Sequence, residues 1–169
     1  MAERVDTLLK QAALARREMR IADARRDLVE AVALCRETCG GLDLARAITE
    51  LGRLERDLTH ADAAVACYAE AAALYRSADK PLRLAHSIRH VADIHSDAGR
   101  GALAADLYVE ALQIYRSHSD TPSLDLANAL RGLTIVRRQA GNSDEAQELW
   151  SEALGLYASV NVPVPPDLP

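Results

Sequence analysis

A series of small and large side chains at helical spacing recurs along the chain. It is clearest at Ala104, Tyr108, Ala111 and Tyr115, whose steps of four, three and four place all four side chains on one stripe of an α-helix. Further copies are Ala64, Tyr68, Ala71 and Tyr75; Ala146, Trp150, Ala153 and Tyr157; and, more loosely, Ala24, Leu28, Ala31 and Cys35. The copies begin 40, 40 and 42 residues apart. A fixed period of this length predicts stacked helical hairpins, with the tyrosines in the core.

Turn and capping signals divide the chain into eight helices. Gly40-Gly41 is expected to end the second helix and Thr59 to cap the fourth. Pro81 is expected to open the fifth helix, and Thr121 to cap a seventh helix that opens at Pro122. The remaining expected boundaries are a first helix over 3–17, a second over 22–38, a third after Asp43, a turn at Gly99 and Gly101, and an eighth helix capped at Asn142 or Ser143 and ending near Ser159.

The predicted fold is all-α: a right-handed α-solenoid of about four helix–turn–helix repeats. The repeats are expected at about 3–40, 44–77, 81–118 and 122–159, in a single domain over 1–159. The tail, 160–169, contains four prolines and is expected to adopt polyproline II conformation.

Composition excludes several classes of protein. The net charge of -5 argues against non-specific nucleic-acid binding, which requires a basic footprint. The charged N-terminus does not suit a signal peptide, and no stretch reaches the roughly 20 apolar residues of a membrane span. We therefore expect a cytoplasmic protein without membrane or nucleic-acid partners. Cys35, Cys39 and Cys67 suit neither a zinc site nor a disulfide framework, and Cys67 is expected to be a buried apolar residue.

The repeats resemble those of the tetratricopeptide repeat family, in the longer form found in kinesin light chains and many bacterial regulators. The family pattern places Leu-Gly in the first helix and alanine, an aromatic and alanine in the second. The second repeat offers Leu51-Gly52 with Ala64, Tyr68 and Ala71. The first repeat has Gln11-Ala12 in place of Leu-Gly, and the aromatic of the first helix is missing throughout. The resemblance implies a scaffold that binds proteins and has no catalytic residues or cofactor.

In this family the first helices of successive repeats line a concave groove. Transferring those positions to this chain predicts an arginine-rich peptide-binding groove formed by Arg46, Arg53, Arg56, His86, Arg89, His90, Asp93, Asn128, Arg131 and Arg138. Because guanidinium groups bind carboxylates in a planar fork, the expected partner is an acidic or carboxylate-bearing segment of another protein. The alternative is that the exposed helix faces of an arginine-rich protein simply carry arginine.

His86, His90, Asp93 and Asp97 follow at steps of four, three and four on one helix face. A histidine pair at this spacing can bind a metal, although no further ligand is evident, so solvated groove residues are the competing interpretation. There is no glycine-rich phosphate loop or nucleophile elbow, and no enzymatic activity is expected.

Two other functions remain open. The last hairpin lacks a polar capping helix, so Leu149, Leu156 and Val160 could form an apolar face for a homodimer. The second open function is a regulatory domain that is gated by a metal or small ligand at His86 and His90.

Overall fold

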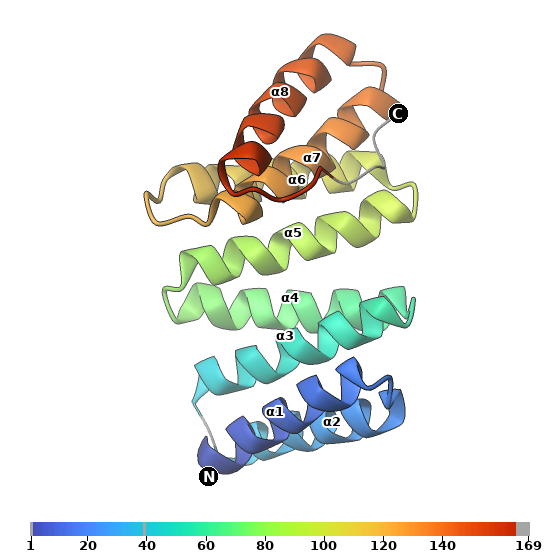
Figure 1. Ribbon diagram of the computed structural model, residues 1–169. Coiled ribbons are helices and arrows are strands. Elements are labelled where there is room, and N and C mark those ends of the chain that lie inside the picture. Colours follow the sequence, from blue (N-terminus) through green and yellow to red (C-terminus); the bar gives the residue numbers. More distant parts are fainter. Residues whose placement is uncertain (1, 39, 165–169) are drawn as a thin grey trace. The chain divides into compact units, whose positions relative to one another are not determined.

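The structure, a computed structural model, describes residues 2–38 and 40–164, and these contain eight α-helices and no strand (Figure 1). In chain order the helices are α1 (Ala2–Arg17), α2 (Ile21–Thr38), α3 (Gly41–Asp57), α4 (Ala61–Ser77), α5 (Pro81–Asp97), α6 (Gly101–Arg116), α7 (Ser123–Gln139) and α8 (Ser143–Ser159). Each odd-numbered helix packs against the even-numbered helix that follows it. The all-α class and the expected eight helices are confirmed.

The hairpins form two compact units, Met1–Lys80 and Pro81–Pro169. In the first unit α3 packs on α1 and α2 as well as on α4. In the second unit α7 packs on α5 and α6 as well as on α8. Each unit is therefore a pair of hairpins in which the third helix is held from several sides. The expectation of one continuous domain over 1–159 stays a prediction.

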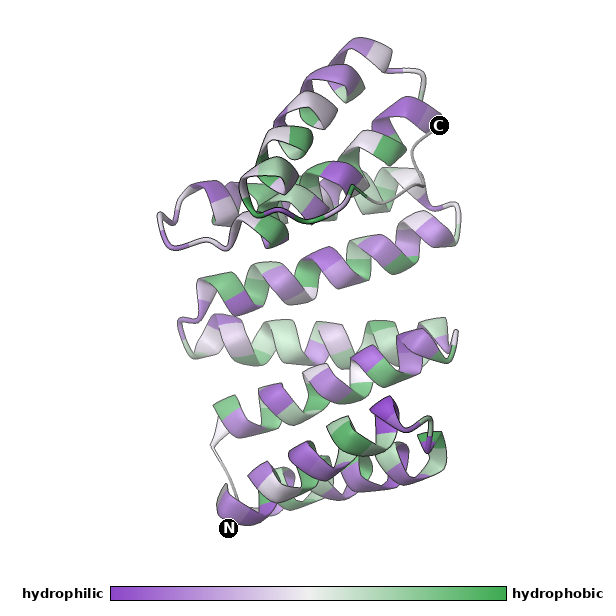
Figure 2. Ribbon diagram, in the orientation of Figure 1, coloured by the Kyte–Doolittle hydropathy of each residue, from purple (hydrophilic) through white to green (hydrophobic). Residues whose placement is uncertain are grey.

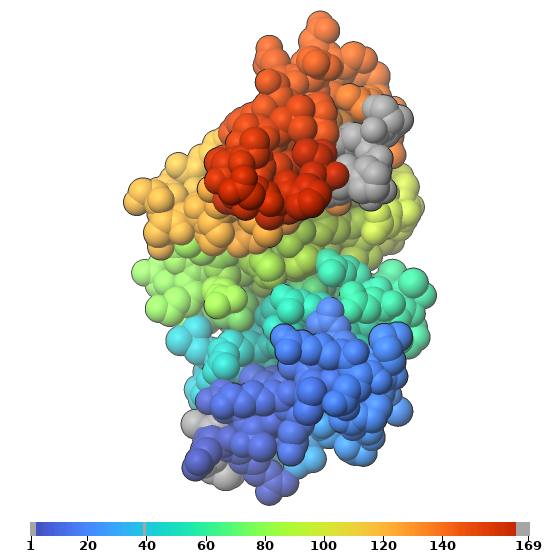
Figure 3. Space-filling view, in the orientation of Figure 1, coloured from blue at the N-terminus to red at the C-terminus, as the bar shows by residue number. Residues whose placement is uncertain are grey.

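The recurring small and large residues form the interior of each hairpin. Ala64, Ala104 and Ala146 are fully buried, and the tyrosines that follow them are buried, namely Tyr68, Tyr75, Tyr108, Tyr115 and Tyr157. This confirms that the tyrosines belong to the core. Trp150, the large residue of the last copy, is half-buried. Hydrophobic residues form stripes on helices that are otherwise polar (Figure 2). In the space-filling view the atoms of the N-terminal hairpin, coloured blue, form a closed surface (Figure 3).

The turn inside every hairpin has one residue in the left-handed region. These residues are Met19, Thr59, Gly99 and Gly141, with φ of 59°, 62°, 72° and 84°. The expected turn at Gly141 is confirmed, but Thr59 is not the N-cap of α4. It lies in the turn, and its hydroxyl donates to the carbonyl of Leu58 at 2.6 Å. The helix begins two residues later, after His60.

Two other helix starts differ from expectation. α3 begins at Gly41 rather than after Asp43, because Gly40 takes the extended N-cap conformation. Pro122 is the N-cap of α7 and not its first residue, while the Thr121 hydroxyl donates to the Tyr115 carbonyl at 2.7 Å. Asn142 is the N-cap of α8 as expected, although its side chain makes no capping hydrogen bond. α5 opens at Pro81 as expected.

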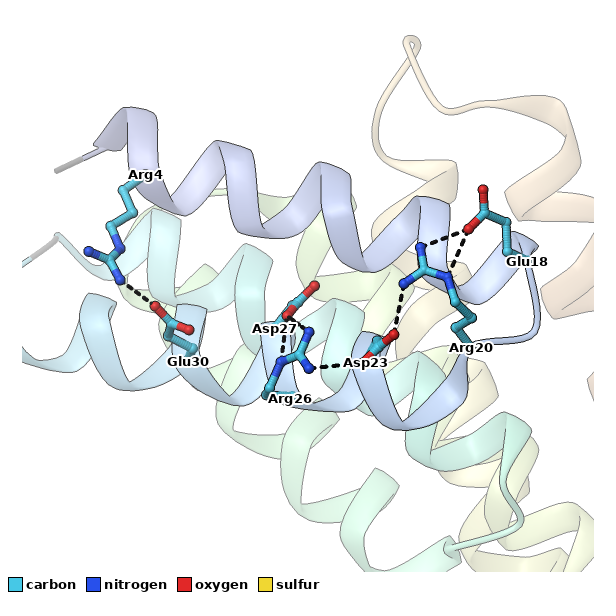
Figure 4. A network of polar contacts seen from close by, with 7 residues as sticks. All are labelled: Arg4, Glu18, Arg20, Asp23, Arg26, Asp27 and Glu30. Carbon is cyan, nitrogen blue, oxygen red and sulfur yellow. Dashed lines mark hydrogen bonds and ion pairs between the residues drawn. The ribbon is translucent and has the colours of Figure 1, made fainter.

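Ion pairs cover the surface of the N-terminal hairpin (Figure 4). Arg4 joins Glu30 at 2.6 Å and so links α1 to α2, and Arg20 bridges Glu18 and Asp23 across the turn. These side chains are largely exposed, so their contribution to stability is small. Two expectations fall partly outside the described residues: Cys39, and the polyproline conformation of the tail beyond residue 164. The helix before the tail ends at Ser159 as expected.

A candidate peptide-binding face on the second unit

Four residues form a stripe along α7: Asn128, Arg131, Ile135 and Arg138. Their spacing of three, four and three places them on one helix face, and all four are half-buried. The hydroxyl of Tyr157, on α8, donates to Oδ1 of Asn128 at 2.8 Å. The amide oxygen is therefore occupied, and Asn128 presents its NH₂ group as a donor. The stripe contains no acidic residue, so its polar groups are donors.

Tyr157 is fixed in the protonated form that this contact requires. Burial raises the pKa of Tyr157, and the nearby Arg131 acts in the opposite direction without reversing the shift. The phenol therefore keeps its proton at neutral pH and continues to orient Asn128.

The corresponding stripe on α5 is largely closed. Arg89 is only 8% exposed, and its Nη1 donates to Oδ2 of Asp93 at 2.7 Å. The same carboxylate accepts from Nδ1 of His90 at 3.2 Å, and its Oδ1 accepts from the Tyr108 hydroxyl at 2.8 Å. Asp93 thus already gives Arg89 the carboxylate that a bound peptide would have supplied.

The arginine also fixes the tautomer of the buried histidine. Nη2 of Arg89 lies 2.9 Å from Nε2 of His90, and because a guanidinium can only donate, this Nε2 carries a lone pair. The proton of the neutral imidazole is then on Nδ1, facing Asp93. Burial lowers the pKa of His90 to about 3, against the hydrogen bond to Asp93 and with the help of the Arg89 charge.

Arg89 and His90 are therefore not open groove residues. Both side chains are buried, so they are not the solvated residues that the competing interpretation expected. His86 lies at its more accessible end, with Nε2 3.1 Å from Nε2 of His90 and Nδ1 3.7 Å from Asp125 of α7. Over residues 2–38 and 40–164, no three histidine, cysteine or acidic side chains are placed to hold a metal ion.

The predicted groove arginines of α3, in the first unit, have acidic neighbours. Arg46 contacts Asp6 at 3.1 Å and Asp43 at 3.3 Å. Arg53 lies 3.4 Å from Glu50, and Arg56 lies 3.8 Å from Asp57. Three of these acidic residues are close in sequence to their arginine, whereas Asp6 comes from α1 and its contact requires the structure. The predicted groove residues of α7 include two arginines, against three on α3, and no acidic residue.

Sequence reasoning missed the role of Gly132. A Cβ at this position of α7 would meet the ring of Tyr108 at 2.3 Å. The missing side chain gives the ring its space between α5 and α7, where its hydroxyl reaches Asp93. A glycine inside a strongly helical pattern was the available signal.

The three residues of the expected dimer face differ in exposure, and the homodimer stays a prediction. Leu149 and Leu156 are half-buried, and they lie on the same flank of α8 as Glu152, which binds Arg116 of α6 at 2.6 Å. Through Glu152 this flank contacts α6. Val160 is 38% exposed.

Paired hairpins with a repeated small–large core define a helical-repeat protein, and comparison identifies the repeat. Residues 83–159 match the family model described as tetratricopeptide repeat. The fold supports the general role of a protein–protein interaction scaffold. The assignment to the longer 40–42-residue subtype stays a prediction. No helix in the described part of the chain combines the length and hydrophobicity needed to cross a membrane.

Solved structures share the fold across nearly the whole chain. BtubC (BKLC) from P. vanneervenii has a TM-score of 0.84 at 19% identity, over 98% of this chain and 67% of its own. The apo form of RapI has a TM-score of 0.84 at 14% identity, over 94% and 57%. Aspartyl phosphate phosphatase F from Bacillus subtilis also gives 0.84 at 14%, over 94% and 41%. The chain thus spans little more than half of RapI and less than half of the phosphatase. No curated protein matches the sequence.

Proposed function

We propose that this protein is a binding scaffold that captures an acidic or carboxylate-bearing segment of a partner protein on the α7 stripe. The observation that carries the proposal is the orientation of Asn128. Because Tyr157 occupies its amide oxygen, the stripe offers an amide donor and the guanidinium groups of Arg131 and Arg138. Donors with positive charge on one helix face suit a carboxylate, which only accepts. The proposal includes no catalytic step and no cofactor.

The test compares peptides that differ in one charge. Fluorescence anisotropy would follow binding of a labelled peptide library in which Asp and Glu are replaced by Asn and Gln, and free C-termini by amides. We expect carboxylate-bearing members to bind selectively. Arg131→Glu with Arg138→Glu should weaken them by at least about tenfold, since a lost charged hydrogen bond is worth more than 1.4 kcal/mol.

The matched control reverses two positive charges on α1, with Lys10→Glu and Arg17→Glu, both at exposed positions. It should leave binding unchanged. Arg131→Lys keeps the charge but loses the planar fork, so an intermediate affinity is expected. Circular dichroism confirms folding of each variant. Equal loss in the control, or indifference of the peptides to their carboxylates, would refute the proposal.

A further inference from the structure

A hollow of about 210 Å³ opens on the first unit between α2, α3 and α4. Its aliphatic walls are Val29 and Val32 of α2 with Ile48 and Leu51 of α3, and Cys67 of α4 completes them. Cys67 is half-buried, so the expectation of a fully buried residue is corrected. A hollow with walls of this kind favours an apolar occupant over water, which needs polar partners.

A two-pronged ion pair borders the hollow. Nη2 of Arg36, on α2, donates to both carboxylate oxygens of Glu70, on α4, at 3.0 and 2.9 Å. Both side chains are about half exposed, at 57% and 42%. The hollow is therefore apolar inside, and its rim carries charged groups that can contact a polypeptide backbone.

The second unit repeats this arrangement with larger side chains. The ion pair of Arg116 with Glu152, at 2.6 Å, lies at the positions equivalent to Arg36 and Glu70. The position equivalent to Cys67 holds Leu149. The positions equivalent to Val32 and Ala33 hold Leu112 and Gln113, which are also larger. The second unit therefore has a leucine at the position that Cys67 occupies in the first.

A neighbouring depression extends the hollow along α2. It measures about 510 Å³ and shares Val29 and Ala33 with the first. Its other residues are Ala22, Arg25, Arg26 and Glu30. An occupant of the hollow can therefore continue over an apolar strip edged by charges, as a peptide does and a small apolar molecule does not.

We propose that the hollow at Cys67 is an anchor pocket for a leucine-sized aliphatic side chain of a partner polypeptide, which lies along α2. The partner's side chain supplies to the first unit what Leu149 supplies to the second. This surface is separate from the α7 stripe and does not depend on the function proposed for it.

The free thiol of Cys67 allows a direct test by disulfide exchange. Exchange joins its sulfur to a fragment and releases the other half of the reagent as a thiol. Cys39, which lies outside the described residues, is first replaced by serine, and Cys35 is buried. In a reducing buffer, isobutyl and isopentyl disulfides compete with hydroxyethyl and carboxyethyl disulfides for reaction with the Cys67 thiol. We expect aliphatic fragments to be captured about tenfold more, as burial of two methylene groups predicts.

Ala33→Leu, at an exposed position on the rim, should abolish this preference without disturbing the core. Equal capture of aliphatic and polar fragments by the unsubstituted pocket would overturn the proposal.

A second experiment distinguishes a polypeptide occupant from a small-molecule occupant. An amphipathic-helix phage library is selected on the protein and counter-selected on Cys67→Leu. Enrichment of a single leucine or methionine anchor supports the proposal, and absence of enrichment overturns it even if fragments bind. A dimer in light scattering that Ala33→Leu dissociates would also overturn it, since the occupant would be a second copy. Arg131→Glu with Arg138→Glu should alter neither experiment, so the two proposals fail independently.

Discussion

At the scale of single residues, two helical glycines have opposite surroundings. Gly132 faces the ring of Tyr108, whereas Gly155 has nothing within 4 Å of the Cβ position. Both lie inside helices, where glycine is less favourable than alanine by about 1 kcal/mol. The difference between the stability effects of substituting these two glycines therefore reports on the contact with Tyr108.

Gly132→Ala should destabilise the protein by about 1–3 kcal/mol, because the new methyl group overlaps the ring and the ring cannot move without leaving Asp93. Gly155→Ala should stabilise it by up to about 1 kcal/mol. Urea denaturation measures both. Equal effects of the two substitutions would show that Gly132 is not needed for the placement of Tyr108.

His90 makes stability depend on pH. Unfolded histidine takes up a proton near pH 6.5, whereas folded His90 does so only near pH 3. The unfolded state binds more protons between these values, so this contribution is complete above about pH 6.5 and falls by about 1.4 kcal/mol per unit as pH decreases. Hydrogen bonding and the Arg89 charge, opposing burial, hold the pKa of Asp93 below its usual value, and its contribution is likewise lost in acid.

We expect His90→Gln to flatten the pH dependence of the unfolding free energy between pH 7 and 5. His118→Gln, a substitution of the same kind in the loop after α6, is the control. Parallel pH profiles for the parent protein and His90→Gln would contradict a neutral, buried His90.

At the scale of elements, the four hairpins share one turn. A left-handed residue recurs at Met19, Thr59, Gly99 and Gly141, with the spacing of the repeats. The last two hairpins use glycine and the first two do not. A β-branched residue is the least suited to this conformation, because its Cβ crowds the backbone.

Thr59→Gly should therefore stabilise the first unit by about 1 kcal/mol, the strain relieved being partly offset by the entropy of the unfolded glycine. Gly99→Ala should destabilise the second unit by a similar amount, although nothing lies within 4 Å of the added Cβ. Thermal denaturation followed by circular dichroism compares them. A stabilising Gly99→Ala would contradict the strain argument.

The elements were predictable because their signals are local. Helical periodicity, Pro81 and Gly141 are sufficient to define the hairpins without tertiary information. Thr59 could not be placed, since threonine serves caps far more often than left-handed turns. The burial of Arg89 and His90 was also beyond the sequence, because it depends on Tyr108 reaching across from α6 and on the space beside Gly132. The half-buried stripe on α7 was predicted as a set of residues, but the orientation of Asn128 requires the structure.

At the scale of the whole molecule, the two units contain equivalent positions with different side chains. Leu149 and Cys67 form the clearest pair, and each unit also has the equivalent ion pair between its second and fourth helices. Stability and binding are therefore expected to differ between the units, since filling a hollow stabilises a fold but removes a pocket.

Reciprocal substitutions test this difference. Leu149→Cys should cost about 1–3 kcal/mol by leaving a cavity, while Cys67→Leu should be neutral or stabilising by about 1 kcal/mol. Denaturation of both single variants is sufficient. A strongly destabilising Cys67→Leu would show that the hollow has no space for a leucine.

The hydrogen bond from Tyr157 to Asn128 has a consequence for molecular discrimination. An amide that is free to rotate can present either its oxygen or its nitrogen, and so accepts charged and uncharged partners alike. One held by a phenol cannot adapt in this way. Tyr157→Phe should therefore make the α7 stripe more tolerant of amidated peptides. A single hydroxyl in the hydrophobic interior would then determine how strictly the surface distinguishes an acid from its amide.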